Sequence, residues 1–262
     1  MAKLSAVILA KNKEKFIGAC IESVKNFADE IIVVDDFSTD NTAKICENLG
    51  AKVFRRALNG NWGEQKNFAI GQANFDWLFL IDADERVTPK LAEEIKKILS
   101  ADDKNFAWRC ARLSYFWGKP LRHGGWFPDY VTRLLPKVGT YAEGVVHEKI
   151  CHNCTEKNFD EKKYLVHYPY RNWEHYFNKF NVYTTLAAKK MYESGKSANF
   201  LDIIFHPIWA AGRMYFLRGG FMDGAIGFIL SGFHYFYTMA KYVKLYYIEK
   251  ENRHVTEEAD DV

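Results

Sequence analysis

The chain has 262 residues, of which 48% are hydrophobic, so it can bury a large core and is not a disordered polypeptide. Its formal net charge of +3 is too small to favour nucleic acid as a partner, and five scattered cysteines indicate a reducing compartment rather than a disulfide framework. Six acids and two bases give the tail from Glu249 a charge of −4, which leaves +7 on residues 1–248, a balance suited to an anionic ligand or membrane surface.

Strands and helices alternate through the first hundred residues. Four short apolar runs predict buried strands at Leu4–Ala10, 30–36, 51–56 and 77–81. Apolar residues at helical spacing fill the intervals, which predicts an α/β fold with helices on both faces of a parallel or mixed sheet. We expect no signal peptide before the first run, and no uncharged run is long enough to predict a membrane-spanning helix.

Polar side chains follow three of these strands and are expected to converge, because ligands bind outside the carboxyl ends of parallel strands. The polar residues at the three strand ends are Lys11 and Asn12, Asp35 and Asp36, and Asp82 and Asp84. The segment after the first strand, AKNKEKF, lacks the glycines of a dinucleotide fingerprint or a Walker loop. Any bound phosphates therefore need another partner.

A metal held by carboxylates is the candidate for that partner, and Asp82 and Asp84 are the candidate ligands of the metal. They are separated by one residue, so on an extended chain both carboxylates point to one face and Glu85 points to the other. Two carboxylates so placed can share a divalent cation and orient a diphosphate through it. The alternative is a polar strand exit without a ligand. Glu85 is expected to orient the loop or to bind a basic neighbour.

The second half of the chain changes character. Residues 105–170 predict shorter strands and loops, and 173–195 predict a helix. Residues 200–248 hold 14 aromatic side chains with helical spacing, which predicts either a helical hairpin packed on the preceding domain or a segment lying on a membrane. The segment Gly124–Trp126 predicts either an aromatic platform for a ligand ring or structural glycines around a core tryptophan.

Four segments in order resemble the motifs of family 2 glycosyltransferases of the GT-A fold: LAKNKEKFI, IIVVDDFSTDNT, GEQKNFAI and WLFLIDADERV. Three later segments, GGWFPDYVTRLLP, VHE and RGGFMDGAIGF, are similar to the lipopolysaccharide-core glucosyltransferase subgroup. Enzymes of this family transfer a sugar from a nucleoside diphosphate donor with inversion. The resemblance implies a GT-A catalytic domain over residues 1–195, with a donor half to about 100 and an acceptor half from about 101, followed by a helical appendage with an acidic tail over 196–262.

The resemblance also implies roles for individual residues. It implies that Asp84 ligates Mg²⁺ or Mn²⁺ directly, that Asp82 lies near the ribose and the metal, and that His147 is a further ligand of the metal or diphosphate. Lys13 stands where the family usually has Glu, and Glu14 is the candidate to replace it. The residues expected to bind the donor nucleotide are Lys11, Asn12, Glu14, Asp35, Asp36, Lys66, Asn67, Asp82 and Arg133.

Inverting transfer needs a general base that deprotonates the acceptor hydroxyl. Asp129 matches the position of that base in the family, with Arg133 as its basic partner, although Pro128 replaces the acid that usually precedes it. Glu148 is the rival for this role. The alternatives are a turn residue for Asp129 and a hydrogen-bonded core histidine for His147.

These expectations combine into a metal-dependent hexosyltransferase that uses a nucleoside diphosphate sugar, with UDP-glucose favoured. The expected acceptor is a lipid-linked or cell-envelope saccharide, and the expected location is the cytoplasmic face of the membrane as a peripheral protein. Homo-oligomerisation is left open. The alternatives are a non-catalytic nucleotide-sugar or membrane-binding protein that retains the fold, and a nucleotidyltransferase, which would normally show a Gly-rich basic loop after the first strand.

Overall fold

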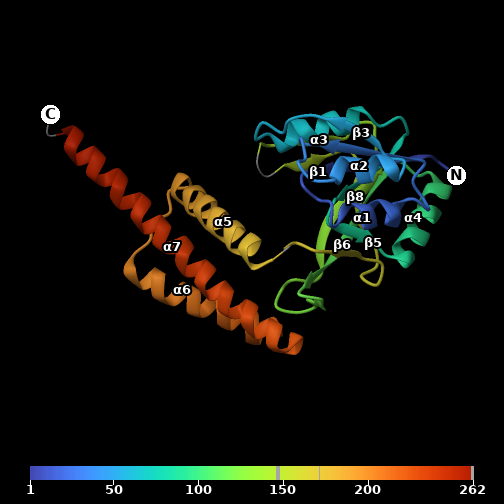
Figure 1. The fold of residues 1–262 in the computed structure, drawn as a ribbon. Helices are drawn as coiled ribbons and strands as arrows, with labels where there is room; N and C mark the ends of the chain where they lie inside the picture. The colour runs from blue at the N-terminus through green and yellow to red at the C-terminus, as the bar shows by residue number, and fades with distance from the viewer. Residues whose placement is uncertain (146–147, 171, 261–262) are drawn as a thin grey trace. The chain divides into compact units, whose positions relative to one another are not determined.

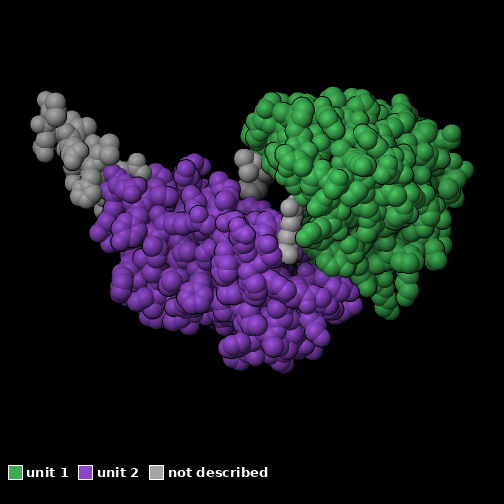
Figure 2. Space-filling view, viewed as in Figure 1, with its two compact units in different colours: residues 1–114, 128–168 green, residues 115–127, 169–262 purple. Residues whose placement is uncertain are grey.

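The computed structural model describes residues 1–145, 148–170 and 172–260, with side chains up to Glu251. The chain forms two compact units (Figure 2). The first unit comprises residues 1–114 and 128–168, and the second comprises 115–127 and 169–262. The domain boundary expected at residue 195 differs from this division, since the helix α5 (Trp173–Glu193) groups with the helices that follow it.

The first unit is built on a mixed sheet (Figure 1). Its parallel part has the order β3-β2-β1-β4 and consists of β1 (Leu4–Ala10), β2 (Glu30–Asp35), β3 (Lys52–Arg55) and β4 (Trp77–Asp82). The sheet continues through β8 (Asp129–Pro136), β6 (Phe106–Phe116), β12 (Leu165–His167) and β5 (Glu85–Val87), with β8 antiparallel to both β4 and β6. Shorter strands are β9 (Tyr141–Glu143), β10 (Lys149–Cys151) and β11 (Thr155–Asn158).

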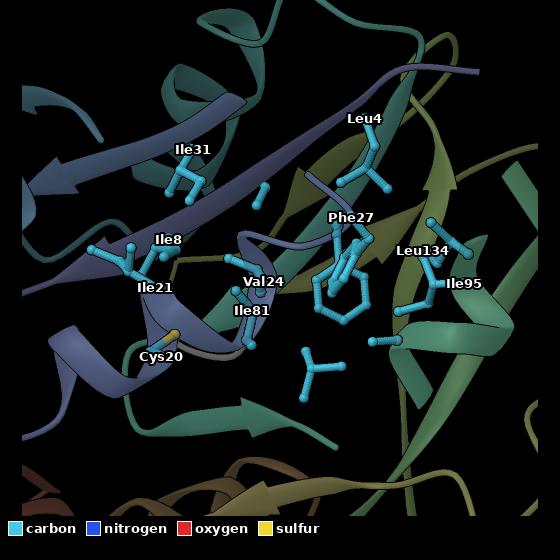
Figure 3. Close-up of a cluster of buried hydrophobic side chains, with 14 of the residues drawn as sticks. Leu4, Ile8, Cys20, Ile21, Val24, Phe27, Ile31, Ile81, Ile95 and Leu134 are labelled. Atoms are coloured by element: carbon cyan, nitrogen blue, oxygen red, sulfur yellow. The ribbon is translucent and has the colours of Figure 1, made fainter. Parts of the chain in front are cut away.

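Helices cover both faces of this sheet, because the fully apolar strands bury side chains on each side. The helices are α1 (Ile17–Val24), α2 (Thr42–Asn48), α3 (Trp62–Gly71) and α4 (Pro89–Ala101). Along β1, Leu4 and Ile8 point into one core with Ile21 and Ile95 (Figure 3). Val7, between them, belongs to the opposite core beneath α3. The expected α/β class and the strand order along the first hundred residues are confirmed.

Glu30 ties together the amino-terminal ends of the parallel strands. Its carboxylate accepts hydrogen bonds from Ser5 Oγ (2.6 Å), Lys52 Nζ (2.8 Å) and both the backbone and the side chain of Asn74 (2.6 and 2.8 Å). Burial acts to raise the pKa of Glu30, but the hydrogen bonds from Lys52, Ser5 and Asn74 outweigh it and lower the pKa to about 2.

Replacing Glu30 with glutamine is therefore expected to lower the free energy of unfolding at pH 7 by about 2–3 kcal/mol. Because the folded pKa lies below the ordinary value of 4.5, this stabilisation is present above pH 4.5 and is lost as the pH falls toward 2. Urea titrations at several pH values measure the effect. Glu22→Gln, at an exposed surface ion pair with Lys25, is the control and should change stability by less than about 0.5 kcal/mol. An equal loss in both variants would contradict the assigned role of Glu30.

The second unit is largely helical (Figure 1). It contains β7 (Lys119–Pro120), α5, α6 (Phe200–Gly212), a π-helical turn η1 (Arg213–Leu217), a 3-10 turn η2 (Gly220–Asp223) and α7 (Ala225–Asp260). Lys244 of α7 donates hydrogen bonds to Asn181, Thr184 and Thr185 of α5 (2.7–2.9 Å), which explains why α5 belongs to this unit. Among the described residues, none of the helices has the length and apolarity needed to cross a membrane.

Candidate functional site

The two aspartates of the D-x-D segment have different partners. The strand β4 ends at Asp82, and Ala83 and Asp84 form a turn before β5. The extended geometry that was expected to place both carboxylates on one face therefore does not continue through Asp84. Asp82 faces the strands β6 and β8, where it meets Arg133, whereas Asp84 faces Lys13 and His167.

A buried network holds Asp82 in place. Arg133 Nη2 donates to Asp82 Oδ2 and to Glu85 Oε1, each at 2.5 Å, and Glu85 Oε2 accepts from the backbone N–H of Asp82 at 3.1 Å. Glu85 is fully buried, and its loop-orienting role matches the expectation from its position after the D-x-D. Burial raises the pKa of Glu85 to about 7 although Arg133 opposes the shift. Burial also acts to raise the pKa of Asp82, but Arg133 and Lys66 hold it well below its usual range.

The basic partner of Asp129 is Arg112, and the expectation that Arg133 would fill this role is wrong. Arg112 donates to Asp129 Oδ2 from Nε at 2.8 Å and from Nη2 at 2.5 Å. The two residues are paired across the antiparallel strands β6 and β8. Arg133 lies four residues further along β8, about 13 Å away on an extended strand, and is occupied by Asp82 and Glu85.

Asp84 lies between the ammonium group of Lys13 and the imidazole ring of His167. Lys13 Nζ is 2.5 Å from Asp84 Oδ2, and His167 Nε2 is 3.9 Å from Asp84 Oδ1. Burial lowers the pKa of His167 to about 4, against the opposing influence of Asp84, so the imidazole is neutral near pH 7. Ser114 Oγ lies 3.1 Å from Nδ1, and a proton on Nδ1 leaves the Nε2 lone pair on the side of Asp84.

Sequence reasoning missed His167. It follows the short apolar pair Leu165–Val166 at the end of β12, so the rule that selected polar residues at strand ends also applies to it. The strand is three residues long, and such a short run gives little periodic signal in the sequence. His147, the histidine that was chosen instead, lies outside the described residues.

Hydrogen bonds connect the residues that follow β1 with those that follow β2, around the place expected for the nucleotide base. Lys11 Nζ and the backbone N–H of Leu58 bind the carboxylate of Asp36 at 2.7 and 3.0 Å. Burial acts to raise the pKa of Asp36, but these two bonds lower it below its ordinary value. A pocket of about 140 Å³ is lined by Lys11, Lys13, Asp36 and Trp62 among others.

The other predicted residues of this loop cluster mainly shape it. Asn12, with φ of 50°, donates its N–H to Ser38 Oγ and accepts from the N–H of Thr39, each at 2.8 Å. Asp35 is buried, with Oδ2 accepting from the N–H of Ser38 and Oδ1 lacking a partner among the described atoms. Glu14 accepts from the backbone and side chain of Asn41.

A second cavity, of about 460 Å³, opens beside Asp82. Lys66 of α3 and Glu148 line it and form an ion pair at 2.8 Å, and Arg112 and Arg133 line it from β6 and β8. Asn67, the next residue along α3, instead exchanges two hydrogen bonds with the backbone of Ala142 on β9 (2.7 and 2.8 Å). The fold therefore brings the predicted donor, metal and base candidates Lys66, Asp82 and Glu148 to one cavity, while Asn67 anchors the neighbouring strand.

Comparison with known proteins identifies the family. The family model described as "Glycosyl transferase family 2" matches residues 5–181. The chain is 32% identical to an uncharacterised glycosyltransferase of Rickettsia typhi, over 97% of this chain and 90% of the relative. The chain belongs to glycosyltransferase family 2.

A second relative of this family 2 glycosyltransferase has a more specific name. The lipopolysaccharide core biosynthesis glycosyltransferase LpsC of Rhizobium meliloti is 35% identical, over 91% of each chain. Among solved structures, glucosyl-3-phosphoglycerate synthase from Mycobacterium tuberculosis, in complex with Mn²⁺, UDP and glucosyl-3-phosphoglycerate, matches with a TM-score of 0.37 and 22% identity. That match covers 44% of each chain.

Family membership confirms that the protein is an enzyme and that its sheet is the expected GT-A sheet, with four parallel strands continued by antiparallel ones. Within the described ranges, no three His, Cys, Asp or Glu side chains are already grouped as a metal site. The side chains of Asp84 and His167 nevertheless fit a divalent cation. The carboxylate of Asp84 already pairs with one positive group, the ammonium of Lys13, and the neutral imidazole of His167 lies beside it.

Proposed function

We propose that this family 2 glycosyltransferase moves a hexose, with UDP-glucose as the favoured donor, onto a lipid-linked or cell-envelope saccharide with inversion. The observation that carries the proposal is the convergence of Asp36, Asp82 and Asp84 at the carboxyl ends of parallel strands, with Lys66 beside Asp82. The acceptor class is supported by the identity to LpsC over 91% of both chains, and lipopolysaccharide core is the first candidate.

Each donor-binding residue contributes a distinct interaction in this proposal. Asp36, whose carboxylate is kept ionised by Lys11, accepts a hydrogen bond from the nucleotide base. Lys66, Arg112 and Arg133 line the cavity at Asp82, each paired with a carboxylate, and in this proposal Lys66 exchanges Glu148 for a phosphate of the donor. Asp84 and His167 would hold Mg²⁺ or Mn²⁺, which neutralises charge on the departing diphosphate. Lys13 sits where it can contact the same phosphates.

Calorimetry with UDP, with and without Mn²⁺, tests the donor part of the proposal. UDP binding that is tighter in the presence of Mn²⁺ supports a metal-linked nucleotide site. This result would separate an enzyme of this kind from a membrane-binding protein that retains the fold. A screen of nucleotide sugars, followed by release of the nucleotide, then identifies the donor sugar. Absence of UDP binding under both conditions would contradict the proposal.

Asp129 is the base that the geometry favours, and its substitution should slow the chemical step. Both acids are ion-paired, Asp129 with Arg112 and Glu148 with Lys66, but the side chain of Asp129 is 46% exposed and that of Glu148 only 21%, so Asp129 is more open to an acceptor. Asp129→Asn is expected to lower kcat by about 10²–10⁴-fold with little change in donor KM. Glu148→Gln is the matched control and should mainly raise the donor KM. The opposite pattern, with kcat lost only in Glu148→Gln, would assign the base to Glu148.

Lys13 should compete with the metal for Asp84. Removal of its ammonium in Lys13→Ala is expected to tighten the binding of Mn²⁺ alone by about threefold to tenfold, since one positive charge leaves the carboxylate. Electron paramagnetic resonance of free Mn²⁺ measures this without nucleotide or turnover. Lys15→Ala, two residues along the chain and exposed, is the control. Weaker Mn²⁺ binding in Lys13→Ala would show that Lys13 instead preorganises the site.

The same proposal places the enzyme at the cytoplasmic membrane face as a peripheral protein. It is supported by large apolar side chains that α6 exposes, including Phe205 and Trp209, each 62% exposed. Such side chains lie favourably in the headgroup region of a bilayer. Co-sedimentation with anionic vesicles tests it, and loss of sedimentation in Phe205→Ser/Trp209→Ser is the expected result.

A further inference from the structure

The second unit contains a cavity that the donor and base residues do not use. It has a volume of about 330 Å³ and is lined by the loop 124–126, by Tyr170 and α5, by the end of α6 with η1, and by α7. Its walls combine aromatic rings with basic groups: Trp126, Tyr170, Arg213, Arg218, His234 and Tyr237. All of these residues belong to the second unit.

The π-helical turn brings two arginines to this cavity. The backbone N–H of Arg218 donates to the carbonyl of Arg213 at 2.9 Å, an i to i+5 hydrogen bond. In an α-helix, residues five apart are rotated by about 140° from one another, whereas the wider π turn brings them to one side. Both side chains consequently line the cavity.

Glycines let the loop 124–126 approach Arg218. The N–H of Gly124 donates to the carbonyl of Arg218 at 2.8 Å. Gly125 has a φ of +86°, and a Cβ atom at this position would lie 2.5 Å from Arg218 Nη1. A larger residue at position 125 would push the guanidinium away. The glycines before Trp126 are thus required by backbone geometry, and Trp126 itself forms a wall of the cavity rather than a fully buried core residue.

The cavity has a net positive charge that the described residues do not neutralise. No carboxylate of the described side chains lies within ion-pair distance of Arg213 or Arg218, and the nearby Asp223 is bound by His123 at 2.8 Å. Burial, and then the charges of Lys241, Arg213 and Arg218, lower the pKa of His234 below its ordinary value. Two guanidinium groups without an acid partner are suited to a phosphate, which they can bind through paired N–H groups.

Apolar surface continues from the same turn. Phe216 and Leu217, which lie between the two arginines in sequence, are each 69% exposed, and Trp209 one turn earlier is 62% exposed. The aromatic walls of the cavity offer a face for a sugar ring or for hydrocarbon. We propose that this cavity is a second binding site, specific for a phosphate ester whose phosphate meets Arg213 and Arg218 and whose organic part rests on Trp126 and the neighbouring apolar surface.

Binding of short probes to the full-length protein tests this proposal without turnover. Dihexanoyl phosphatidic acid, below its micellar concentration, represents a lipid headgroup, and glucose 1-phosphate represents a soluble sugar phosphate. Calorimetry is run on the wild type, on Arg213→Gln/Arg218→Gln, and on Arg122→Gln as an exposed arginine of the same unit that does not line the cavity. Both cavity arginines are exposed, so the double variant should fold, and Arg213→Gln alone is the second variant.

We expect at least one probe to bind the wild type and Arg122→Gln equally, and to bind the double variant at least about tenfold more weakly. Preference for phosphatidic acid identifies a lipid as the source of the phosphate, and preference for glucose 1-phosphate identifies a soluble sugar phosphate. Failure of both probes to bind, or equal binding to the wild type and the double variant, would overturn the proposal. UDP binding measured on the same samples reports separately on the donor site.

Discussion

Asp84→Ala is expected to lower kcat/KM for sugar transfer by about 10²–10³-fold, which is the typical effect of removing one electrostatic contact to developing charge. The physical reason is the position of Asp84, the proposed metal ligand: its carboxylate has Lys13 at 2.5 Å and the neutral His167 at 3.9 Å. In the function proposed above, a metal held here would lose an anionic ligand in this variant and would neutralise the charge of the leaving diphosphate less well. Release of the nucleotide at saturating Mn²⁺ measures the loss.

Asp76→Ala is the matched control for this prediction. Asp76 precedes β4 and Asp84 follows it, so the two acids lie at opposite ends of one strand. The side chain of Asp76 is 70% exposed and pairs with Lys104 at the surface, so its removal should leave transfer unchanged. Undiminished, metal-stimulated transfer by Asp84→Ala would remove Asp84 from the metal site.

Arg133→Met is expected to lower the free energy of unfolding by about 3–5 kcal/mol, the usual cost of leaving a buried charge without its partner. Arg133 is 5% exposed and bridges Asp82 to Glu85, which is fully buried. With the guanidinium gone, Glu85 must be protonated or remain as an uncompensated charge in the core. Chemical denaturation of the variant and the wild type at pH 7 measures the loss.

Two further variants separate the network from a general effect of losing an arginine. Arg109→Met removes a guanidinium that is 36% exposed and whose ion pair with Glu156 is long, at 3.8 Å. This substitution should therefore lower the free energy of unfolding by less than about 1 kcal/mol. Adding Glu85→Gln to Arg133→Met should recover part of the stability, because the buried charge is removed with its partner. Equal losses in Arg133→Met and Arg109→Met would be incompatible with a buried network at β4 and β8.

For the aromatic segment, residues 200–248, the sequence predicted the helices but not the turn between them. Its apolar residues at helical spacing predicted helices, and α6 and α7 confirm this. Composition did not predict the π turn at Arg213, because a one-residue change in helical hydrogen bonding leaves no periodic trace in a single sequence. That turn places Arg213 and Arg218 at one cavity, and the glycine pair at 124–125 admits Arg218.

The sequence by itself determined the alternating strands and helices, and with them the edge of the sheet where Asp36, Asp82 and Asp84 lie. Buried strands are continuous apolar runs, and polar residues just beyond them must lie at the carboxyl edge of a parallel sheet. Only the tertiary structure decided which charged groups meet. Asp129 pairs with Arg112 because β6 and β8 are in register, and His167 reaches Asp84 because β12 lies between β6 and β5. Register and strand order are set by contacts between distant segments, and no local pattern in the sequence contains them.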